Sequence, residues 1–320
     1  MRYRRFINVG RRDWMHYAAS ATAMGTMGLA TKAQAQIDGV INGRIQQSIV
    51  HWCFADYWSV EETCQIAKRL GCKSVEIVDA HDWHILKKYG LTCALAKGPM
   101  FVQGMNNPRY QDACITHLKK VIDDCADANF PAVIAFTGYA AETGDWADGG
   151  LPDLSKLQQP GNKVIPLDEG IRNCVSGFKR VVGYAEQKKV NLSLEMLNTR
   201  DDSHPMKGHP GYQGNHIDYC MEIINQVGSP RLGLLFDIYH VQIMDGDIIR
   251  RIHTCGDAIN HVHLAGNPGR GELDNKQEIQ FIPCMEALLE IGFKGYVGQE
   301  FIPTGDPLSG LTQAVKLCDV

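Results

Sequence analysis

The sequence lacks an apolar run of membrane length and a glycine-rich phosphate loop. No segment of the 320 residues reaches the ~18 apolar residues that a membrane-spanning helix needs, so we predict no membrane span. A doubly wound nucleotide-binding sheet would carry a glycine-rich loop after its first strand, and residues 52–56 are WCFAD instead. This absence disfavours the doubly wound fold.

The sequence also lacks a C-x-x-C pair, and its eleven cysteines are an odd number. Segments of helical periodicity contain, among others, Cys64, Cys114, Cys125, Cys174, Cys220 and Cys284. This placement is typical of small buried hydrophobic residues and not of a disulfide framework. Unpaired thiols in such number are unusual in an oxidising compartment.

Basic residues are scarce beyond the first 35 positions. The whole sequence has a formal net charge of −4 at pH 7, and residues 1–35 hold six basic residues and one acid, which leaves −9 for residues 36–320. Because an acidic surface repels phosphate backbones, we expect no nucleic-acid partner. The charge also argues against an endonuclease, which would need a basic face.

The first 35 residues have the layout of an export signal. They contain the adjacent pair Arg11-Arg12, a weakly apolar run over 18–30 and the A-x-A sequence of residues 33–35. The arginine pair resembles a twin-arginine signal, so we predict a signal over 1–35 and an exported, periplasmic protein. Twin-arginine export carries folded proteins, which would reconcile export with free thiols. An ordinary secretory signal or a disordered tail is the alternative.

From residue 43 onward, short apolar segments alternate with longer amphipathic ones. Eight candidate strands cover 44–54, 74–79, 92–96, 132–137, 191–197, 232–239, 260–265 and 295–302. Helical periodicity covers 59–70, 110–128, 168–189, 216–227, 247–257 and 279–291, and more weakly 82–89. Eight such repeats suit a (β/α)8 TIM barrel, which typically has ~250 residues. We predict an α/β fold of this class as a single domain over 40–320.

One connection is much longer than the others. Residues 139–166, after the candidate strand 132–137, are polar and rich in glycine and proline. A structureless stretch of this length inside a compact domain is uncommon and often functional. Because loops that follow barrel strands lie on the catalytic face, this segment is a candidate lid.

Four consecutive candidate strands carry a polar residue near their C-terminal ends. They are Glu195 in NLSLEML, Asp237 in LLFDIYH, His263 in NHVHLAG and Glu300 in YVGQEFI. Each alone could be a core salt bridge or a hydrogen-bonded core histidine. Neighbouring strand ends of a barrel converge, however, and a buried charge needs a partner. We therefore predict a divalent-cation site, preferably for Mn²⁺ or Mg²⁺, with Zn²⁺ or Co²⁺ as alternatives.

Four local motifs resemble one family. They are NTRD at 198–201, FDIYHVQIMDGD at 236–247, NPGRGELD at 267–274 and GYVGQEF at 295–301. Over about residues 44–302 the chain resembles the hydroxypyruvate isomerase branch of the xylose isomerase-like barrels, most closely from residue 190 onward. The resemblance implies a TIM barrel, a bound divalent metal and an isomerase activity.

The resemblance also implies roles for particular residues. The metal ligands would be Glu195, Asp237, His263 and Glu300. Glu195 and Glu300 would in addition be the catalytic acid/base pair, and His240 and Arg270 would contact the substrate.

Further candidates lie in loops or strands near these motifs. Arg200 is a candidate clamp for a substrate carboxylate, with a loop-fixing salt bridge as the alternative. His209, in GHPGYQG, is a second candidate substrate contact. Glu76 either positions the site or makes an internal hydrogen bond, and Trp52 and Phe101 are candidates for an apolar wall.

These residue types predict proton transfer beside a carbonyl group. Removing that proton gives an enediolate, whose charge a divalent cation stabilises, and two glutamates can take and return the proton. We predict an isomerase or epimerase of a small hydroxy-carbonyl substrate, a hydroxy-keto acid or a sugar, and leave open a homo-oligomer. The alternatives are a metal-dependent lyase or deglycosidase acting on keto-sugars, and a non-catalytic exported binding barrel.

Overall fold

The computed structural model describes residues 39–99, 101–141, 164–203 and 205–320. Two predictions fall on residues outside these ranges. They are the export signal over 1–35 and the candidate lid over 139–166, of which residues 142–163 are not described. Among the described residues, no helix combines the length and the apolar character that crossing a membrane requires. All eleven cysteines are described, and all are buried and free, which confirms the prediction made for those in helical segments.

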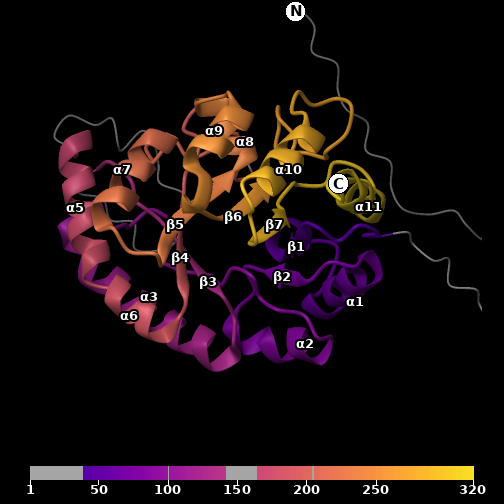
Figure 1. Ribbon diagram of the computed structural model, residues 1–320, viewed down its shortest axis with the longest axis horizontal. Coiled ribbons are helices and arrows are strands. Elements are labelled where there is room, and N and C mark those ends of the chain that lie inside the picture. The colour runs from indigo at the N-terminus through magenta and orange to yellow at the C-terminus, as the bar shows by residue number, and fades with distance from the viewer. Residues whose placement is uncertain (1–38, 100, 142–163, 204) are drawn as a thin grey trace, which may run out of the picture. The chain divides into compact units, whose positions relative to one another are not determined.

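Seven parallel strands form the central sheet (Figure 1). They are β1 (Gln46–Val50), β2 (Ser74–Glu76), β3 (Ala132–Ala135), β4 (Asn191–Glu195), β5 (Leu232–Asp237), β6 (Ile259–Leu264) and β7 (Tyr296–Gln299). Their order is β2-β1-β7-β6-β5-β4-β3, so the first and last strands pair with each other. This parallel order, with neighbours in sequence also neighbours in space, is that of a TIM barrel.

The remaining predicted strand, residues 92–96, lies between β2 and β3 and closes the sheet. Its first residue pairs with Ser74 of β2 and its last with Val133 of β3, both in parallel. The pairing is interrupted between them because the Ala94 N–H donates to the Ser74 hydroxyl, at 2.8 Å. The predicted (β/α)8 barrel is confirmed, with one strand held by isolated bridges.

Helices lie outside the strands (Figure 1). They are α1 (Val60–Leu70), α2 (Trp83–Lys88), α3 (Pro108–Ala128), α5 (Leu167–Lys179), α6 (Val182–Lys188), α7 (Ile217–Val227), α8 (Ile238–Met244), α9 (Ile248–Cys255), α10 (Phe281–Glu290) and α11 (Pro307–Leu317), with 3-10 turns η1 (His51–Phe54), η2 (Ala80–Asp82) and η3 (Gly256–Ala258). The predicted helix 168–189 is two helices, because Val181 leaves the helical conformation at φ −123°. Helices α8 and α11 were not predicted.

All seven strands end earlier than the sequence predicted, and the ends of β1 and β5 lead into the site. The first stops at Val50, where η1 begins. The strand β5 stops at Asp237, because Oδ1 of this residue accepts hydrogen bonds from the N–H groups of Tyr239, at 2.8 Å, and His240, at 3.3 Å. Asp237 thereby becomes the N-cap of α8, and its Oδ2 is left for contacts with other side chains.

Aromatic packing holds two strand ends together. The rings of Phe54, in η1, and Phe301, after β7, are fully buried, with centroids 5.3 Å apart and planes at 86°. Phe54 also stacks on Trp58 at 5.2 Å. Burial of each phenylalanine contributes about 1.5–3 kcal/mol. The cluster therefore fixes the positions of Trp52 and Glu300, which flank these rings in the sequence.

Tyr212 ties β4 to the segment after β3. Its hydroxyl accepts a hydrogen bond from the Thr137 N–H and donates one to the carbonyl of Glu195, both at 2.9 Å. Tyr212→Phe removes the hydroxyl that forms hydrogen bonds with two buried backbone groups. We therefore expect the free energy of unfolding, measured by urea denaturation, to fall by about 2 kcal/mol. The control Tyr57→Phe, at a half-exposed ring, should change stability by less than about 0.5 kcal/mol. Equal stability of Tyr212→Phe and the parent protein would contradict this assignment.

Candidate active site

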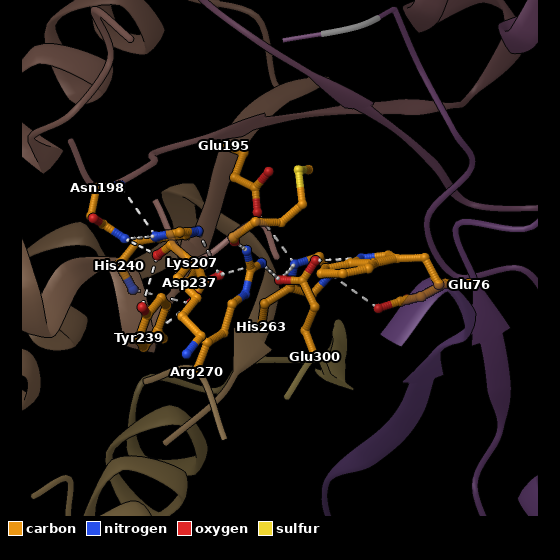
Figure 2. Close-up of polar contacts among 12 residues, drawn as sticks. Glu76, Glu195, Asn198, Lys207, Asp237, Tyr239, His240, His263, Arg270 and Glu300 are labelled. Carbon is orange, nitrogen blue, oxygen red and sulfur yellow. Dashed lines mark hydrogen bonds and ion pairs between the residues drawn. The ribbon is translucent and has the colours of Figure 1, made fainter. Parts of the chain in front are cut away.

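Four side chains from neighbouring strands meet at the C-terminal end of the sheet (Figure 2). Glu195 ends β4, Asp237 ends β5, His263 lies near the end of β6, and Glu300 follows β7. The register places Asp237 beside His263, and His263 beside Gly298. Each of the four offers one ligand atom, and these atoms all lie within 4.8 Å of one another in the buried interior.

His263 contacts both glutamates. Its Nδ1 lies 3.1 Å from Oε2 of Glu300 and 3.4 Å from Oε1 of Glu195. The two glutamates come from strands on either side of β5 and β6. A group bound next to His263 would therefore meet a carboxylate on each side.

Arg270 and Trp52 hold Glu300 at both of its oxygens. The Arg270 Nη2 donates to Oε2 at 2.7 Å, and the Trp52 Nε1–H donates to Oε1 at 3.0 Å. The guanidinium lies over the rings of Trp52, at 5.2 Å, and Tyr239, at 5.7 Å, and is 4.0 Å from Oδ2 of Asp237. Because Arg270 is buried and paired, it fixes the orientation of Glu300.

Burial and neighbouring charges shift the pKa values of the three carboxylates in different directions. Burial raises the pKa of Asp237 to about 8, and the charge of Glu300 acts in the same direction. Burial also raises the pKa of Glu195. For Glu300, burial acts upward, but the charges of Arg270 and His263 outweigh it and hold the pKa well below its usual range. Two of the three carboxylates are thus costly to ionise without a further positive charge.

The donor set fits a divalent cation. Three carboxylates and one imidazole nitrogen are ligands that Mn²⁺ and Mg²⁺ accept, and Zn²⁺ and Co²⁺ tolerate. A cation at this point would supply the positive charge that the buried carboxylates require. The residues that would hold it are Glu195, Asp237, His263 and Glu300.

A cavity of about 300 Å³ opens onto this cluster. Its polar lining consists of Lys97, Glu195, His209, Arg270 and Glu300, and its apolar lining includes Trp52, Phe101, Phe136 and Leu197. The volume is at the lower end of the range for small-molecule sites, roughly 300–1,000 Å³. Trp52 and Phe101 thus lie where an apolar wall was predicted.

Among the other predicted substrate contacts, His209 lines the cavity, whereas His240 and Arg200 do not. His209 lies in the cavity wall against Phe101, with ring centroids 4.6 Å apart, and burial lowers its pKa to about 3. His240 is fully buried and is not among the lining residues; its Nδ1 accepts from the Asn198 N–H at 3.1 Å. Arg200 is exposed and donates to the Ile243 carbonyl at 2.7 Å, outside the cavity.

Two residues near the site were missed or only half recognised in the sequence. His261 lies two positions before His263, and alternation along a strand places both on the same face. Glu76, which the sequence predicted either to position the site or to make an internal hydrogen bond, contacts both imidazoles. The spacing of the histidines was a usable signal, whereas nothing local linked either of them to Glu76.

Comparison with known proteins defines the family. The family model described as xylose isomerase-like TIM barrel matches residues 64–318, so the chain belongs to that family and the predicted resemblance is confirmed. A crystal structure of AP endonuclease, family 2, from Brucella melitensis has the same fold, with a TM-score of 0.67 at 22% identity over 84% of this chain and 96% of that one.

Curated relatives match over shorter segments. The putative hydroxypyruvate isomerase of Xenopus laevis is 37% identical over 113 residues, which are 34% of this chain and 41% of the relative. The 2-oxo-tetronate isomerase of Cupriavidus necator is 30% identical over 152 residues, 46% of this chain and 55% of the relative. The chain thus spans about half the length of the curated relatives it matches.

Metal removal should reveal the site in the stability of the protein. We expect Mn²⁺ at 100 times its Kd to stabilise chelator-treated protein by about 2.7 kcal/mol, a rise of about 5 °C in Tm. Asp237→Asn should abolish this rise. Without metal at pH 7 the variant should be about as stable as the parent protein, because a pKa of about 8 already keeps the Asp237 carboxyl largely neutral and the asparagine Oδ1 can still cap α8.

The control for this experiment is Asp257→Asn, which changes an exposed carboxylate and should keep the full rise. Differential scanning calorimetry with and without Mn²⁺ measures both variants. A full Mn²⁺ response in Asp237→Asn would remove Asp237 from the ligand set.

Proposed function

We propose that the protein is a divalent-metal-dependent isomerase or epimerase of a small hydroxy-carbonyl compound, similar in its reaction to hydroxypyruvate isomerase. Membership in the xylose isomerase-like family supports the reaction class. The names of two relatives, hydroxypyruvate isomerase and 2-oxo-tetronate isomerase, support a hydroxy-keto acid as substrate.

One observation carries the proposal: Glu195 and Glu300 face the same small cavity beside His263. Both line the cavity, and both approach Nδ1 of His263, at 3.4 Å and 3.1 Å. Moving a carbonyl to the next carbon, or inverting a carbon beside it, requires a proton to leave and return. Two carboxylates flanking one bound molecule can do both.

In this proposal, different residues transfer the proton and hold the transferring groups in place. One of the two glutamates removes the proton beside the carbonyl, and the other delivers a proton to the neighbouring carbon in an isomerisation or to the opposite face of the same carbon in an epimerisation. In the isomerisation the proton of the neighbouring hydroxyl group also passes to the former carbonyl oxygen. Arg270 and Trp52 keep Glu300 in a single orientation through this transfer. A bound divalent cation would stabilise the negative charge that develops on the substrate oxygens.

The cavity wall would orient the substrate. The Nδ1 atom of His209 is buried and without a hydrogen-bond partner among the described residues, so it is free to contact a substrate oxygen. Burial disfavours the charged imidazole, and His209 would act as a neutral hydrogen-bonding group. The aromatic rings of Trp52, Phe101 and Phe136 would exclude water from the proton-transfer step.

Proton exchange tests this proposal directly. Protein with Mn²⁺ in D₂O should incorporate deuterium beside the carbonyl of hydroxypyruvate or of a small ketose, as followed by NMR. Glu195→Gln and Glu300→Gln should each lower the exchange rate by at least about 100-fold at saturating Mn²⁺, because each removes a proton-transferring group.

Glu286→Gln, at an exposed position of α10, is the control and should exchange at the parental rate. Full exchange in the Glu195→Gln, Glu300→Gln double variant would refute the mechanism. If the parent protein binds Mn²⁺ but incorporates deuterium into none of these substrates, the proposed reaction is wrong. That result would favour a larger glycosidic substrate or a binding role.

We also propose that the chain is exported by the twin-arginine route to the periplasm. The pair Arg11-Arg12 and the A-x-A sequence at 33–35 support export. The eleven buried, free cysteines support a protein that folds in a reducing compartment before transport.

Cell fractionation tests the export proposal. In a bacterium with twin-arginine transport, the full chain should appear in the periplasm with its new N-terminus after Ala35. The double variant Arg11→Lys, Arg12→Lys should remain in the cytoplasm as precursor. Periplasmic delivery of this variant at the parental level would instead favour an ordinary secretory signal.

A further inference from the structure

A second group of buried polar side chains lies directly behind His263. Glu76 at the end of β2 and His261 in β6 are 0% and 1% exposed. Oε1 of Glu76 lies 3.1 Å from Nε2 of His261 and 3.1 Å from Nε2 of His263. The cation site described above uses Nδ1 of His263, so Glu76 contacts the other nitrogen of the same ring (Figure 2).

We propose that Glu76 is a positioning residue that fixes His263 as an Nδ1 metal ligand. A neutral imidazole carries a proton on one nitrogen and a lone pair on the other. The hydrogen bond from Nε2–H to the Glu76 carboxylate places the proton on Nε2 and leaves the lone pair of Nδ1 facing Glu195 and Glu300. This inference rests on the proposed metal dependence.

The hydrogen bond to Glu76 also makes Nδ1 a better donor to a metal. A carboxylate that accepts a hydrogen bond from a ligating histidine fixes the ring and raises its basicity. His261 supplies a second hydrogen bond to the same oxygen of Glu76, with its ring 5.0 Å from that of His263 and at 90° to it. Glu76 is therefore held from two directions before any metal binds.

The packing leaves Glu76 and His263 almost no freedom. A methyl group at Gly298 would lie 2.1 Å from Oε1 of Glu76 and 2.8 Å from Cδ2 of His263. Gly298 is the register neighbour of His263 in β7, so the absence of a side chain there makes room for the pair. The Glu76–His263 contact therefore depends on glycine at position 298.

Mn²⁺ titration, with free Mn²⁺ measured by electron paramagnetic resonance, tests the proposal. The parent protein should bind one Mn²⁺ per chain. Glu76→Gln keeps the size of the side chain but removes its charge, so its Kd for Mn²⁺ should rise about 10–100-fold. Glu290→Gln is the matched control, because it alters an exposed glutamate that contacts a histidine, His253, at 3.4 Å. Its Kd should not change.

A structural role alone would lower Tm without this change in Kd, so the melting temperature of each variant in chelator is measured beside the titration. Glu76→Asp keeps the charge but has a shorter reach, and its Kd should lie between those of the parent and Glu76→Gln. This variant also keeps the test available if Glu76→Gln does not fold. ¹⁵N-histidine NMR of the Zn²⁺-loaded parent should show His263 bound through Nδ1 and protonated at Nε2.

The outcomes separate this inference from the proposed function. A Kd of Glu76→Gln within twofold of the parent value, or binding of Zn²⁺ through Nε2, overturns the positioning role. Two Mn²⁺ per chain would assign Glu76 and His261 to a second cation and also overturn it. A parent protein that binds Mn²⁺ with the predicted Glu76 dependence but exchanges no proton refutes the reaction and leaves the positioning role intact. If neither Mn²⁺ nor Zn²⁺ binds, both proposals are wrong.

Discussion

The site depends on one electrostatic constraint, the gathering of three carboxylates around His263 in a buried volume. Ligand atoms of Glu195, Asp237, His263 and Glu300 lie within 4.8 Å of one another. Such an arrangement is unfavourable unless positive charge and hydrogen-bond donors compensate it. Arg270 supplies part of the charge, and the first N–H groups of α8 bind one oxygen of Asp237. The remaining charge is the reason that the cluster suits a divalent cation.

The barrel meets this constraint by geometry. The strands β4, β5, β6 and β7 are neighbours in the sheet, so one residue near the C-terminal end of each suffices to build the cluster. The contacts of His263 divide between its two ring nitrogens, with Glu195 and Glu300 at Nδ1 and Glu76 at Nε2. The cation site and the buried Glu76–His261 pair therefore meet in one side chain. A small cavity with aromatic walls above it is suited to proton transfer away from water.

Much of this arrangement could be read from the sequence, and the limits have physical causes. Alternating apolar segments indicated the barrel, and a polar residue within an apolar strand marked each member of the cluster. The pattern placed the end of β5 two residues too late, because Ile238 and Tyr239 are apolar in a helix as well as in a strand. The N-cap formed by Asp237 makes these residues helical, and a hydrophobic pattern gives no information about such a cap.

The fold class, the strand that carries each cluster residue, and the family follow from periodicity and local motifs in the amino-acid sequence. Which side chains meet depends on the tertiary structure. Trp52 reaches Glu300, and Glu76 reaches His261, across 248 and 185 positions of the chain. It also turned Arg200 toward a helix end and His209 into the cavity. Such contacts arise when the closed barrel brings distant strand ends together, and no local pattern records that closure.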